Sequence, residues 1–315
     1  MFENYFYYFS SFKGTRNIVW FFLYIFEHKI FIMAKRLTPS EMFMYSTIRI
    51  ECIDKSGNKS TGTGFFFNFS EDLENKTHIP VIITNKHVIE NSASGYFLFT
   101  LADTNGDPLD TVHHRFEISD FTKAWILHPD PNVDLCAMPL YTIINYMTKL
   151  GKKPFIIPFQ SKMIPSKEIL DNLEAMEEII MIGYPNGIWD TINNQPILRK
   201  GITATHPNKD YCGKKEFMAD IASFPGSSGS PILIYNNNGY KDKNGNLFMG
   251  NARIILLGVL YAGPQHTVSG EIKILTIPTK QIPIPISTIP NNLGLIIKSE
   301  RILELEKIVE KHLMS

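Results

Sequence analysis

A tight loop followed directly by an apolar strand is predicted by the sequence FPGSSGSPIL at residues 224–233. Gly226 and Gly229 lack a Cβ, so backbone N–H groups in this loop can converge on one point. Converging N–H groups stabilise the negative charge that develops on a carbonyl oxygen during acyl transfer. Ser228 lies between the two glycines and is the candidate nucleophile. Most loops rich in serine and glycine carry no chemistry, so partners must be found elsewhere in the chain.

A histidine and an aspartate upstream of this loop are the candidate partners. His87 lies in the sequence TNKHVI at residues 84–89, where a strand runs into a turn. Asp134 lies at the start of an apolar strand in HPDPNVDLCAMPL at residues 128–140. A carboxylate beside an imidazole fixes its tautomer and stabilises the imidazolium, which allows the histidine to act as a general base. Asp130 is the competing acid, although its two flanking prolines favour a turn.

The order of the three residues along the chain is His87, Asp134, Ser228. Subtilisin has the order Asp, His, Ser, and the α/β-hydrolases have the order Ser, Asp, His with a Gly-x-Ser-x-Gly turn. Residues 226–229 read Gly-Ser-Ser-Gly and lack that turn, and the chain lacks the alternating strands and helices of a hydrolase sheet. The order therefore favours a different fold for the same chemistry.

Short β-type runs separated by turn residues fill the chain from about residue 47 to 289. Many short strands at this spacing predict an all-β protein, either a sandwich or a pair of barrels. Gly57-Asn58 predicts a hairpin turn, residues 235–251 predict an exposed hairpin insertion, and residues 286–290 are rich in turn signals. A short helix is expected at 167–176, and strands are expected at 46–51, 63–67, 80–84, 95–101, 124–127, 135–140, 178–182, 217–221, 231–235, 254–261 and 272–277.

One amphipathic helix is predicted near the end of the chain, at residues 299–313. Ser299 opens it, and Glu300 places an acid in its first turn. Its apolar face consists of Ile302, Leu305, Ile308, Val309 and Leu313. A stripe at this spacing indicates that the helix packs on the core of the protein.

Residues 1–32 are rich in Phe, Tyr and Trp and contain none of these motifs. Lys13 and Arg16 precede an apolar run at residues 18–26, as in a signal peptide, but no small-residue cleavage site follows. The run is also shorter than the roughly 20 residues that span a membrane. A weak membrane anchor is one interpretation. We favour the other, that translation starts at Met33 and the preceding residues lie outside the fold.

The composition is that of an ordinary globular protein, with 44% hydrophobic and 20% charged residues, and excludes a chain disordered throughout. Basic and acidic residues number 31 each, so the zero net charge gives no indication of a nucleic-acid partner. Cys52, Cys136 and Cys212 show no CxxC spacing, which argues against a disulfide framework and against a structural zinc site. We expect free thiols, a cytoplasmic location and no metal or cofactor, and the oligomeric state stays open.

A series of motifs then extends over most of the chain. They are TGTGF at 61–65, TNKHV at 84–88, VDLCAM at 133–138, GYPNG at 183–187, GSSGSP at 226–231 and LGVLY at 257–261. In this order they resemble the trypsin-like, chymotrypsin-fold serine peptidases, nearest the bacterial Deg-type branch. The resemblance implies two six-stranded antiparallel β-barrels with a C-terminal helix, and a catalytic site in the cleft between the barrels.

The resemblance also implies a role for each candidate residue. The Ser228 hydroxyl attacks the scissile carbonyl, His87 accepts and returns the proton, and Asp134 orients His87. The N–H groups of Gly226 and Ser228 form the oxyanion hole. The implied activity is that of a serine endopeptidase acting on protein or peptide substrates through an acyl-enzyme. A catalytically silent peptide-binding or scaffold module and an esterase with the same triad are the alternatives.

Ser227 departs from the secreted digestive members of that family, which have an aspartate at this position. Their aspartate pairs with a new N-terminus released by zymogen cleavage, and a serine cannot form that ion pair. We therefore expect no zymogen activation of this type. Activity would then depend on the order of the loop or on a partner.

Substrate specificity is predicted from the position six residues before the nucleophile, which is the floor of the primary pocket in this family. Ala222 occupies it and supplies no acid for a Lys or Arg substrate, although Asp220 is two positions away. Tyr261, Ala262 and Gly263 are the expected pocket walls. A small or apolar P1 residue, the substrate residue before the scissile bond, is the resulting prediction.

The expected domain organisation has three parts. Residues 1–32 form an extension, and residues 33–290 form the peptidase domain, with the boundary between the barrels at about 141–176. Residues 291–315 carry the C-terminal helix. Because the chain ends soon after that helix, we expect no PDZ domain of the kind found in full Deg-type proteases.

Overall fold

The computed structural model describes residues 37–72, 77–250, 252–269 and 286–314. Strands predominate, which confirms the expected all-β class. The strands are β1 Thr47–Asp54, β2 Lys59–Asp72, β3 Thr77–Thr84, β4 Ser92–Ala102, β5 Pro108–Ser119, β6 Ile126–Leu127, β7 Cys136–Pro139, β8 Phe159–Gln160, β9 Glu178–Gly183, β10 Ile197–Thr203, β11 Glu216–Asp220, β12 Pro231–Asn236, β13 Gly239–Lys241, β14 Leu247–Met249, β15 Arg253–Ala262, β16 Gln265–Ser269, β17 Ile286–Pro290 and β18 Leu293–Lys298. The helical elements are α1 Pro39–Phe43, α2 Lys86–Ile89, η1 Phe121–Ala124, α3 Tyr141–Lys149, η2 Ser161–Met163, α4 Lys167–Asp171, η3 Pro185–Gly187 and α5 Glu300–Met314.

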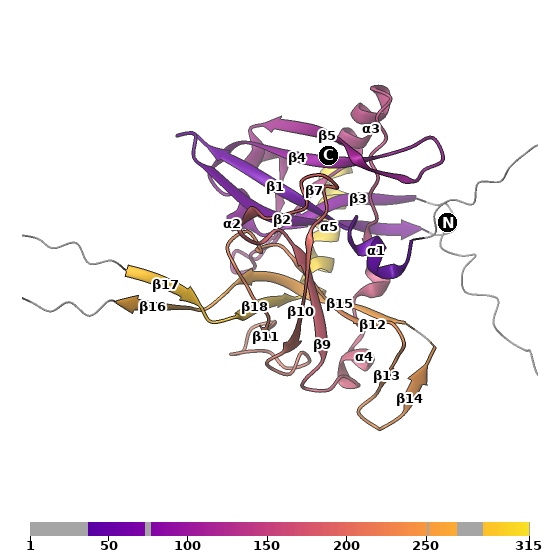
Figure 1. Cartoon of the computed structure of the whole chain (residues 1–315), viewed down its shortest axis with the longest axis vertical. Coiled ribbons are helices and arrows are strands. Elements are labelled where there is room, and N and C mark those ends of the chain that lie inside the picture. The colour runs from indigo at the N-terminus through magenta and orange to yellow at the C-terminus, as the bar shows by residue number, and fades with distance from the viewer. Residues whose placement is uncertain (1–36, 73–76, 251, 270–285, 315) are drawn as a thin grey trace, which may run out of the picture. The chain divides into compact units, whose positions relative to one another are not determined.

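The strands form two large sheets, one in each half of the fold, and two small sheets that each pair two strands, β13 with β14 and β16 with β17 (Figure 1). The second half is a closed barrel of six strands in the order β10-β11-β18-β15-β12-β9, as expected. The first half is a sheet in the order β5-β4-β1-β2-β3-β7-β6, and β8 pairs with β2 in parallel. The two-half, chymotrypsin-like arrangement is thus confirmed. In the first half, however, the described strands number eight and their pairing gives no closed ring of six.

Strand β2 shows how the sequence builds the boundary between the halves. Side chains on a strand alternate between its two faces, so consecutive phenylalanines point in opposite directions. Phe65, Phe67 and Phe69 join a buried cluster that also contains Leu233 of the second half. Phe66 belongs to a separate cluster inside the first half. A strand that is apolar on both faces is therefore buried on both, and it ties the two halves together.

Helix α5 packs on this shared cluster, as its apolar stripe predicts. Ile302, Leu305 and Val309 have no exposed surface and belong to the cluster between the halves. The helix contacts β6, β7 and β18 and is drawn in yellow behind the strands in Figure 1. Leu313 at the end of the expected stripe is half exposed, at 50%. The helix thus docks through its first three turns.

Several elements differ from the sequence-based expectation. Residues 293–298 form strand β18, which lies between β11 and β15 in the closed barrel, whereas the sequence grouped these residues with the C-terminal helix. Residues 286–290 form β17. The expected helix at 167–176 shortens to α4, and the expected strand at 124–127 splits between η1 and β6.

Strands β5 and β10 and helix α3 were not predicted. Strand β5 alternates between partly buried and exposed residues and contains a run of polar side chains, so its hydrophobic signal is weak. The expected strand at 272–277 and the extension at 1–32 lie outside the described residues. The boundary at about 141–176 falls between β7 and β9, and the three-part division of the chain stays a prediction.

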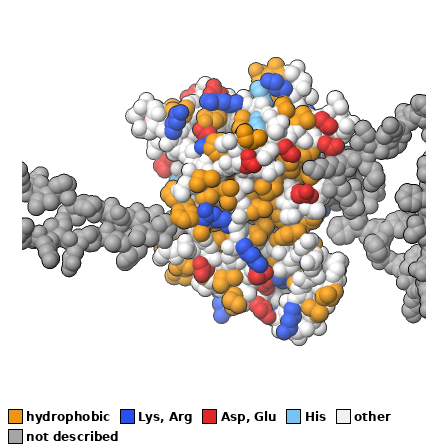
Figure 2. Space-filling view, viewed as in Figure 1, with side chains coloured by type: hydrophobic (Ala, Val, Ile, Leu, Met, Phe, Trp, Pro, Cys, Tyr) orange, Lys and Arg blue, Asp and Glu red, His pale blue; other side chains and the backbone are white. Residues whose placement is uncertain are grey.

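The surface carries charges of both signs. On the face shown in Figure 2, basic and acidic side chains are interspersed, and hydrophobic side chains gather across its middle. The expected hairpin insertion within 235–251 is confirmed by β13 and β14, which pair with each other and expose Leu247 and Met249. None of the helices in the described part of the chain is long and apolar enough to cross a membrane.

Candidate active site

His87 and Asp134 meet at the edge of the first half, where β3 ends and β7 begins. The ring nitrogen Nδ1 of His87 lies 2.5 Å from Asp134 Oδ2. The backbone N–H of His87 donates to the other carboxylate oxygen, Oδ1, at 3.1 Å. The His87 side chain is 44% exposed and that of Asp134 is 23% exposed, so the imidazole keeps an open face toward solvent. Asp134 therefore holds both the ring and the backbone of the histidine.

Asn85 fixes the relative position of these two segments. It precedes α2 as the N-cap residue and is fully buried. Its side-chain Nδ2 donates to the backbone oxygen of Asp134 at 2.7 Å. Because strand β3 pairs with β7 through Thr84 and Cys136, the turn that carries His87 and the turn that carries Asp134 are joined on both sides.

Asp130, the competing acid, is engaged elsewhere. Its carboxylate accepts hydrogen bonds from the backbone N–H of Asn132 at 2.9 Å and from the guanidinium of Arg301 on α5 at 2.8 Å. The Asn132 N–H and the Arg301 guanidinium hold the pKa of the Asp130 carboxyl below its ordinary value. The structure thus brings Asp134, and not Asp130, to His87.

The loop at 226–229 has the backbone conformation that its glycines suggest. Gly226 and Gly229 both have a φ of 87°, in the left-handed region that side chains disfavour. Ser227 N–H donates to Phe224 O at 3.0 Å, and Gly229 N–H donates to Leu260 O at 2.8 Å. Within the described residues, the N–H groups of Gly226 and Ser228 donate to no protein acceptor. These are the two N–H groups expected to bind an oxyanion.

Ser228 is partly exposed, and its loop lies against the strand that leads to His87. A Cβ on Gly229 would lie 1.9 Å from Thr63 O and 2.5 Å from Thr84 Oγ1, so the two segments are in close contact. Within the described part of the chain, the Ser228 hydroxyl makes no hydrogen bond to the His87 ring. The third contact of the expected triad therefore stays a prediction, and such contacts often tighten only when substrate binds.

Replacing Gly226 with alanine is expected to disable the oxyanion site. The new Cβ would lie 2.6 Å from Tyr184 O, a backbone atom that cannot swing aside, and the residue would keep an unfavourable φ. The loop must therefore shift, and displacing one oxyanion donor lowers kcat by about 10²–10³-fold. Peptide hydrolysis measures the loss of kcat, and thermal melting measures the loss of stability caused by the shifted loop.

Gly57→Ala is the matched control for that substitution. Gly57 has a similar φ of 85°, but a Cβ there would meet nothing within 4 Å. This variant keeps the backbone strain without the collision, so its kcat should equal that of the wild type. Equal losses of kcat in the two variants would contradict the assignment of the Gly226 N–H.

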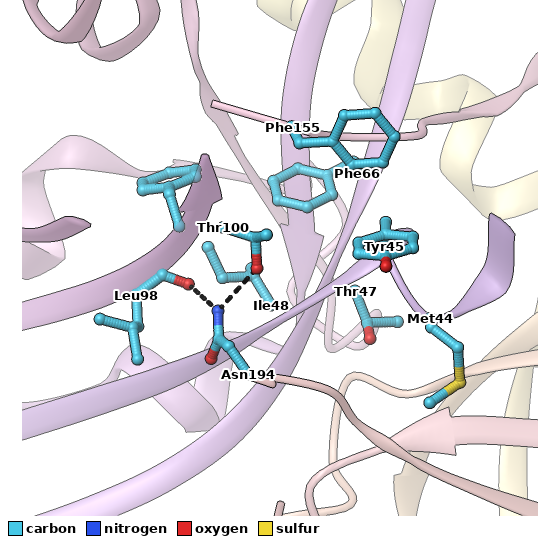
Figure 3. Close-up of a pocket in the computed structure, with 10 residues that line it drawn as sticks. Met44, Tyr45, Thr47, Ile48, Phe66, Leu98, Thr100, Phe155 and Asn194 are labelled. Atoms are coloured by element: carbon cyan, nitrogen blue, oxygen red, sulfur yellow. Dashed lines mark hydrogen bonds between the residues drawn. The ribbon is translucent and has the colours of Figure 1, made fainter. Parts of the chain in front are cut away.

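Neither of two surface cavities coincides with the expected site. The pocket in Figure 3 is about 10 Å³, which is room for about one water molecule. In it, Asn194 Nδ2 donates to Leu98 O at 2.9 Å and to Thr100 Oγ1 at 3.2 Å. These two bonds attach a loop of the second half to β4. The other cavity, of about 250 Å³, lies beside α4 and the start of α5, and no expected site residue lines it.

The sequence profile of the trypsin-like peptidase domain matches residues 62–239, more than half of the chain. The chain belongs to the trypsin-like peptidase family. The matched segment contains His87, Asp134 and Ser228. None of the curated proteins compared with the chain matches it.

Solved structures of proteases are similar to this chain at low identity. The HtrA-type protease AlgW with tripeptide is 13% identical, with a TM-score of 0.42, over 85% of this chain and 61% of that one. The serine endoprotease from Yersinia pestis is 14% identical, with a TM-score of 0.41, over 85% and 62%. A protease from M. tuberculosis in its active form is 14% identical, with a TM-score of 0.40, over 89% and 91%. The chain thus spans less than two thirds of the length of the first two.

The residues expected to line the specificity pocket lie at the ends of β11 and β15 in the closed barrel. Ala222 follows β11, and its carbonyl accepts a hydrogen bond from the Arg199 guanidinium at 2.6 Å. The same guanidinium lies over the Phe224 ring, 4.8 Å from its centroid, and burial lowers its pKa. The charged side chain in contact with the expected floor is therefore a cation. Sequence reasoning missed Arg199 because β10 was not predicted.

The expected pocket walls, Tyr261, Ala262 and Gly263, are at the end of β15. Gly263 is exposed, and a Cβ on it would lie 3.5 Å from the Cβ of Ser223. The Tyr261 ring packs against the cluster between the halves, and its hydroxyl donates to Glu216 Oε2 at 2.9 Å. Burial and this carboxylate raise the pKa of Tyr261. Its hydroxyl is thus engaged within the protein and is not free to meet a substrate.

Ser227, where digestive relatives have an aspartate, has no exposed surface. In the part of the chain that the structure describes, its hydroxyl has no hydrogen-bond partner. No ion pair at this position orders the loop. The loop is ordered by contacts with other residues, chiefly Thr63 and Asn186. Both lie within the sequence motifs, but nothing in those motifs indicated this role.

Proposed function

We propose that the chain is a serine endopeptidase that hydrolyses peptide bonds through His87, Asp134 and Ser228. The observation that carries the proposal is the double contact of Asp134 with His87, at 2.5 Å to the ring Nδ1 and 3.1 Å to the backbone N–H. A carboxylate on Nδ1 favours the tautomer in which Nδ1 carries the proton. Nε2 then has a free lone pair, which is the requirement for a general base beside a nucleophile.

The proposed reaction has two halves. His87 Nε2 takes the Ser228 proton while the serine oxygen bonds to the scissile carbonyl carbon, and the N–H groups of Gly226 and Ser228 stabilise the resulting oxyanion. The C–N bond breaks as the imidazolium gives its proton to the leaving amine, which leaves an acyl-enzyme on Ser228. A water molecule, deprotonated by His87, then attacks the ester and releases the second product.

Basic P1 residues are expected to be poor substrates for this enzyme. The Ala222 side chain offers no acid, and the Arg199 guanidinium places a cation on the Ala222 carbonyl, at 2.6 Å. A buried cation without a partner costs several kcal/mol, so Lys or Arg should be cleaved at least tenfold more slowly than Ala or Val. A P1 scan on otherwise identical peptides measures this. A tenfold preference for Arg, about 1.4 kcal/mol, would contradict the pocket assignment.

Covalent labelling with a fluorophosphonate probe tests the proposed function. The wild type should be labelled and the Ser228→Ala variant should not, and a peptide library should be cleaved by the wild type alone. Thiol alkylation should change neither result, because Cys52 and Cys136 are buried and the exposed Cys212 lies outside the nucleophile loop. Peptide binding without labelling or cleavage would instead favour the silent peptide-binding module. Cleavage of esters without cleavage of folded protein substrates would favour the esterase.

A further inference from the structure

Thr63 connects the two halves at the nucleophile loop. It lies within β2 and has no exposed surface. Its backbone N–H donates to Ser228 O at 2.9 Å, and its hydroxyl donates to Gly226 O at 2.9 Å. The same hydroxyl accepts the backbone N–H of Tyr184 at 3.1 Å. One buried side chain of the first half therefore bonds to the loop and to the turn that follows β9.

The carbonyl groups of the loop are held one after another. In chain order, they accept from the Asn186 N–H (Pro225 O, 2.6 Å), the Thr63 hydroxyl (Gly226 O, 2.9 Å), the Ser230 N–H (Ser227 O, 3.0 Å) and the Thr63 N–H (Ser228 O, 2.9 Å). The C=O and N–H of a trans peptide point in opposite directions. Fixing Pro225 O and Ser227 O therefore directs the N–H groups of Gly226 and Ser228 away from the protein contacts.

The hydroxyl of Thr63 is the group that these contacts share. Asn186, which orients the Gly226 N–H, lies two residues after Tyr184 in the same short turn. The hydroxyl holds that turn through Tyr184 N–H and holds the loop through Gly226 O. Without it, both backbone groups would lose the partner that the structure gives them, and either peptide could rotate to recover a hydrogen bond.

We propose that the Thr63 hydroxyl is a positioning group for the oxyanion hole, which keeps the N–H groups of Gly226 and Ser228 aimed at the reacting carbonyl. It touches no reacting atom and acts through Gly226 and the turn at Tyr184. Ser227 forms no ion pair that could order the nucleophile loop. In this protein Thr63, a residue of the first half, orders that loop instead. The proposal rests on the proposed function, because an oxyanion hole matters only to an acyl-transfer enzyme.

The test compares Thr63→Val with Thr63→Ser and Thr203→Val. Valine keeps the shape of threonine and removes the hydroxyl, whereas serine keeps the hydroxyl. Thr203 is the matched control because it is also buried, and its hydroxyl also accepts a backbone N–H, from Glu177 at 2.9 Å, and donates to a carbonyl, of Ala175 at 2.8 Å. Thermal melting measures the loss of stability that both valine variants share because a buried hydroxyl is removed. A loss of kcat found only in the Thr63 variant is then specific to the nucleophile loop.

For Thr63→Val we expect kcat to fall by about 10–100-fold with little change in KM, less than the 10²–10³-fold lost when a donor is removed outright. Affinity for a peptide aldehyde, whose adduct with Ser228 places an oxyanion in the hole, should fall by the same factor. Affinity for the product peptide should stay unchanged. Thr63→Ser and Thr203→Val should keep the wild-type kcat. A kcat for Thr63→Val equal to that of Thr203→Val, or an equal loss in Thr63→Ser, would overturn the proposal.

Hydrogen–deuterium exchange across residues 222–232 supplies a readout that does not depend on turnover. The Thr63→Val variant should exchange faster there than the wild type and Thr203→Val. If the wild type is neither labelled nor active, the proposed function fails, while the exchange data alone still decide whether Thr63 orders the loop. If Thr63→Val does not fold, Thr63→Ala and Thr203→Ala make the same comparison. Unchanged exchange in the folded Thr63 variant would contradict the proposal.

Discussion

Replacing Ser228 with alanine is expected to lower kcat for peptide hydrolysis by about 10⁴–10⁶-fold while leaving the protein folded. Triad residues act as a unit, so the loss of the nucleophile costs nearly as much as the loss of all three. The residual rate comes from substrate binding and from the oxyanion donors, which this substitution leaves in place. The Ser228 side chain is partly exposed, and within the described residues its hydroxyl has no hydrogen bond to lose. The free energy of unfolding should therefore change by no more than about 0.5 kcal/mol.

Ser227→Ala is the control for that prediction, because it makes the same change one residue earlier. The Ser227 hydroxyl is buried, and in the described structure it has no partner. Its removal should leave kcat within a few-fold of the wild type. Loss of turnover in Ser227→Ala with full turnover in Ser228→Ala would mean that Ser227, and not Ser228, is the nucleophile. Full turnover in both variants would exclude a serine mechanism altogether.

The parts of the fold that sequence could predict are those coded by local signals. The apolar run of β2, the glycines of the nucleophile loop and the apolar stripe of α5 each determine the conformation of a short segment. The order of the motifs then constrains how the segments assemble. Strand β5 was missed because its polar side chains give only a weak hydrophobic pattern. Strand β18 is apolar, but its place in the barrel depends on pairing with β11 and β15, which no local pattern encodes.

The candidate site was predictable to the extent that its residues carry local signals. His87 and Asp134 could be proposed from turns next to apolar strands, but the choice between Asp134 and Asp130 depends on Arg301, which lies 171 positions from Asp130. Thr63 binds a carbonyl 163 positions away. Arg199 likewise reaches Ala222 from a strand that the sequence did not reveal. Contacts of this kind belong to the tertiary structure, and no local pattern encodes them.

Replacing Asp134 with asparagine is expected to lower kcat by about 10⁴-fold with little change in the backbone. The carboxylate accepts two hydrogen bonds, from the ring Nδ1 of His87 and from its backbone N–H. An asparagine has one acceptor oxygen for these two donors. If the oxygen stays on the backbone N–H, the amide NH₂ faces Nδ1 and forces that nitrogen to accept. The proton of the neutral imidazole then moves to Nε2, which can no longer take the proton of Ser228.

Asp130→Asn is the matched control, since Asp130 lies in the same loop and exchanges contacts with Asn132 and Arg301 but not with His87. Loss of the Asp130 carboxylate weakens the attachment of the loop to α5, so we expect a modest drop in melting temperature. The kcat should stay within a few-fold of the wild type. Measuring kcat and thermal melting for both variants separates the two roles. A 10⁴-fold loss in Asp130→Asn together with near wild-type turnover in Asp134→Asn would make Asp130 the catalytic acid. It would also mean that the loop rearranges when substrate binds.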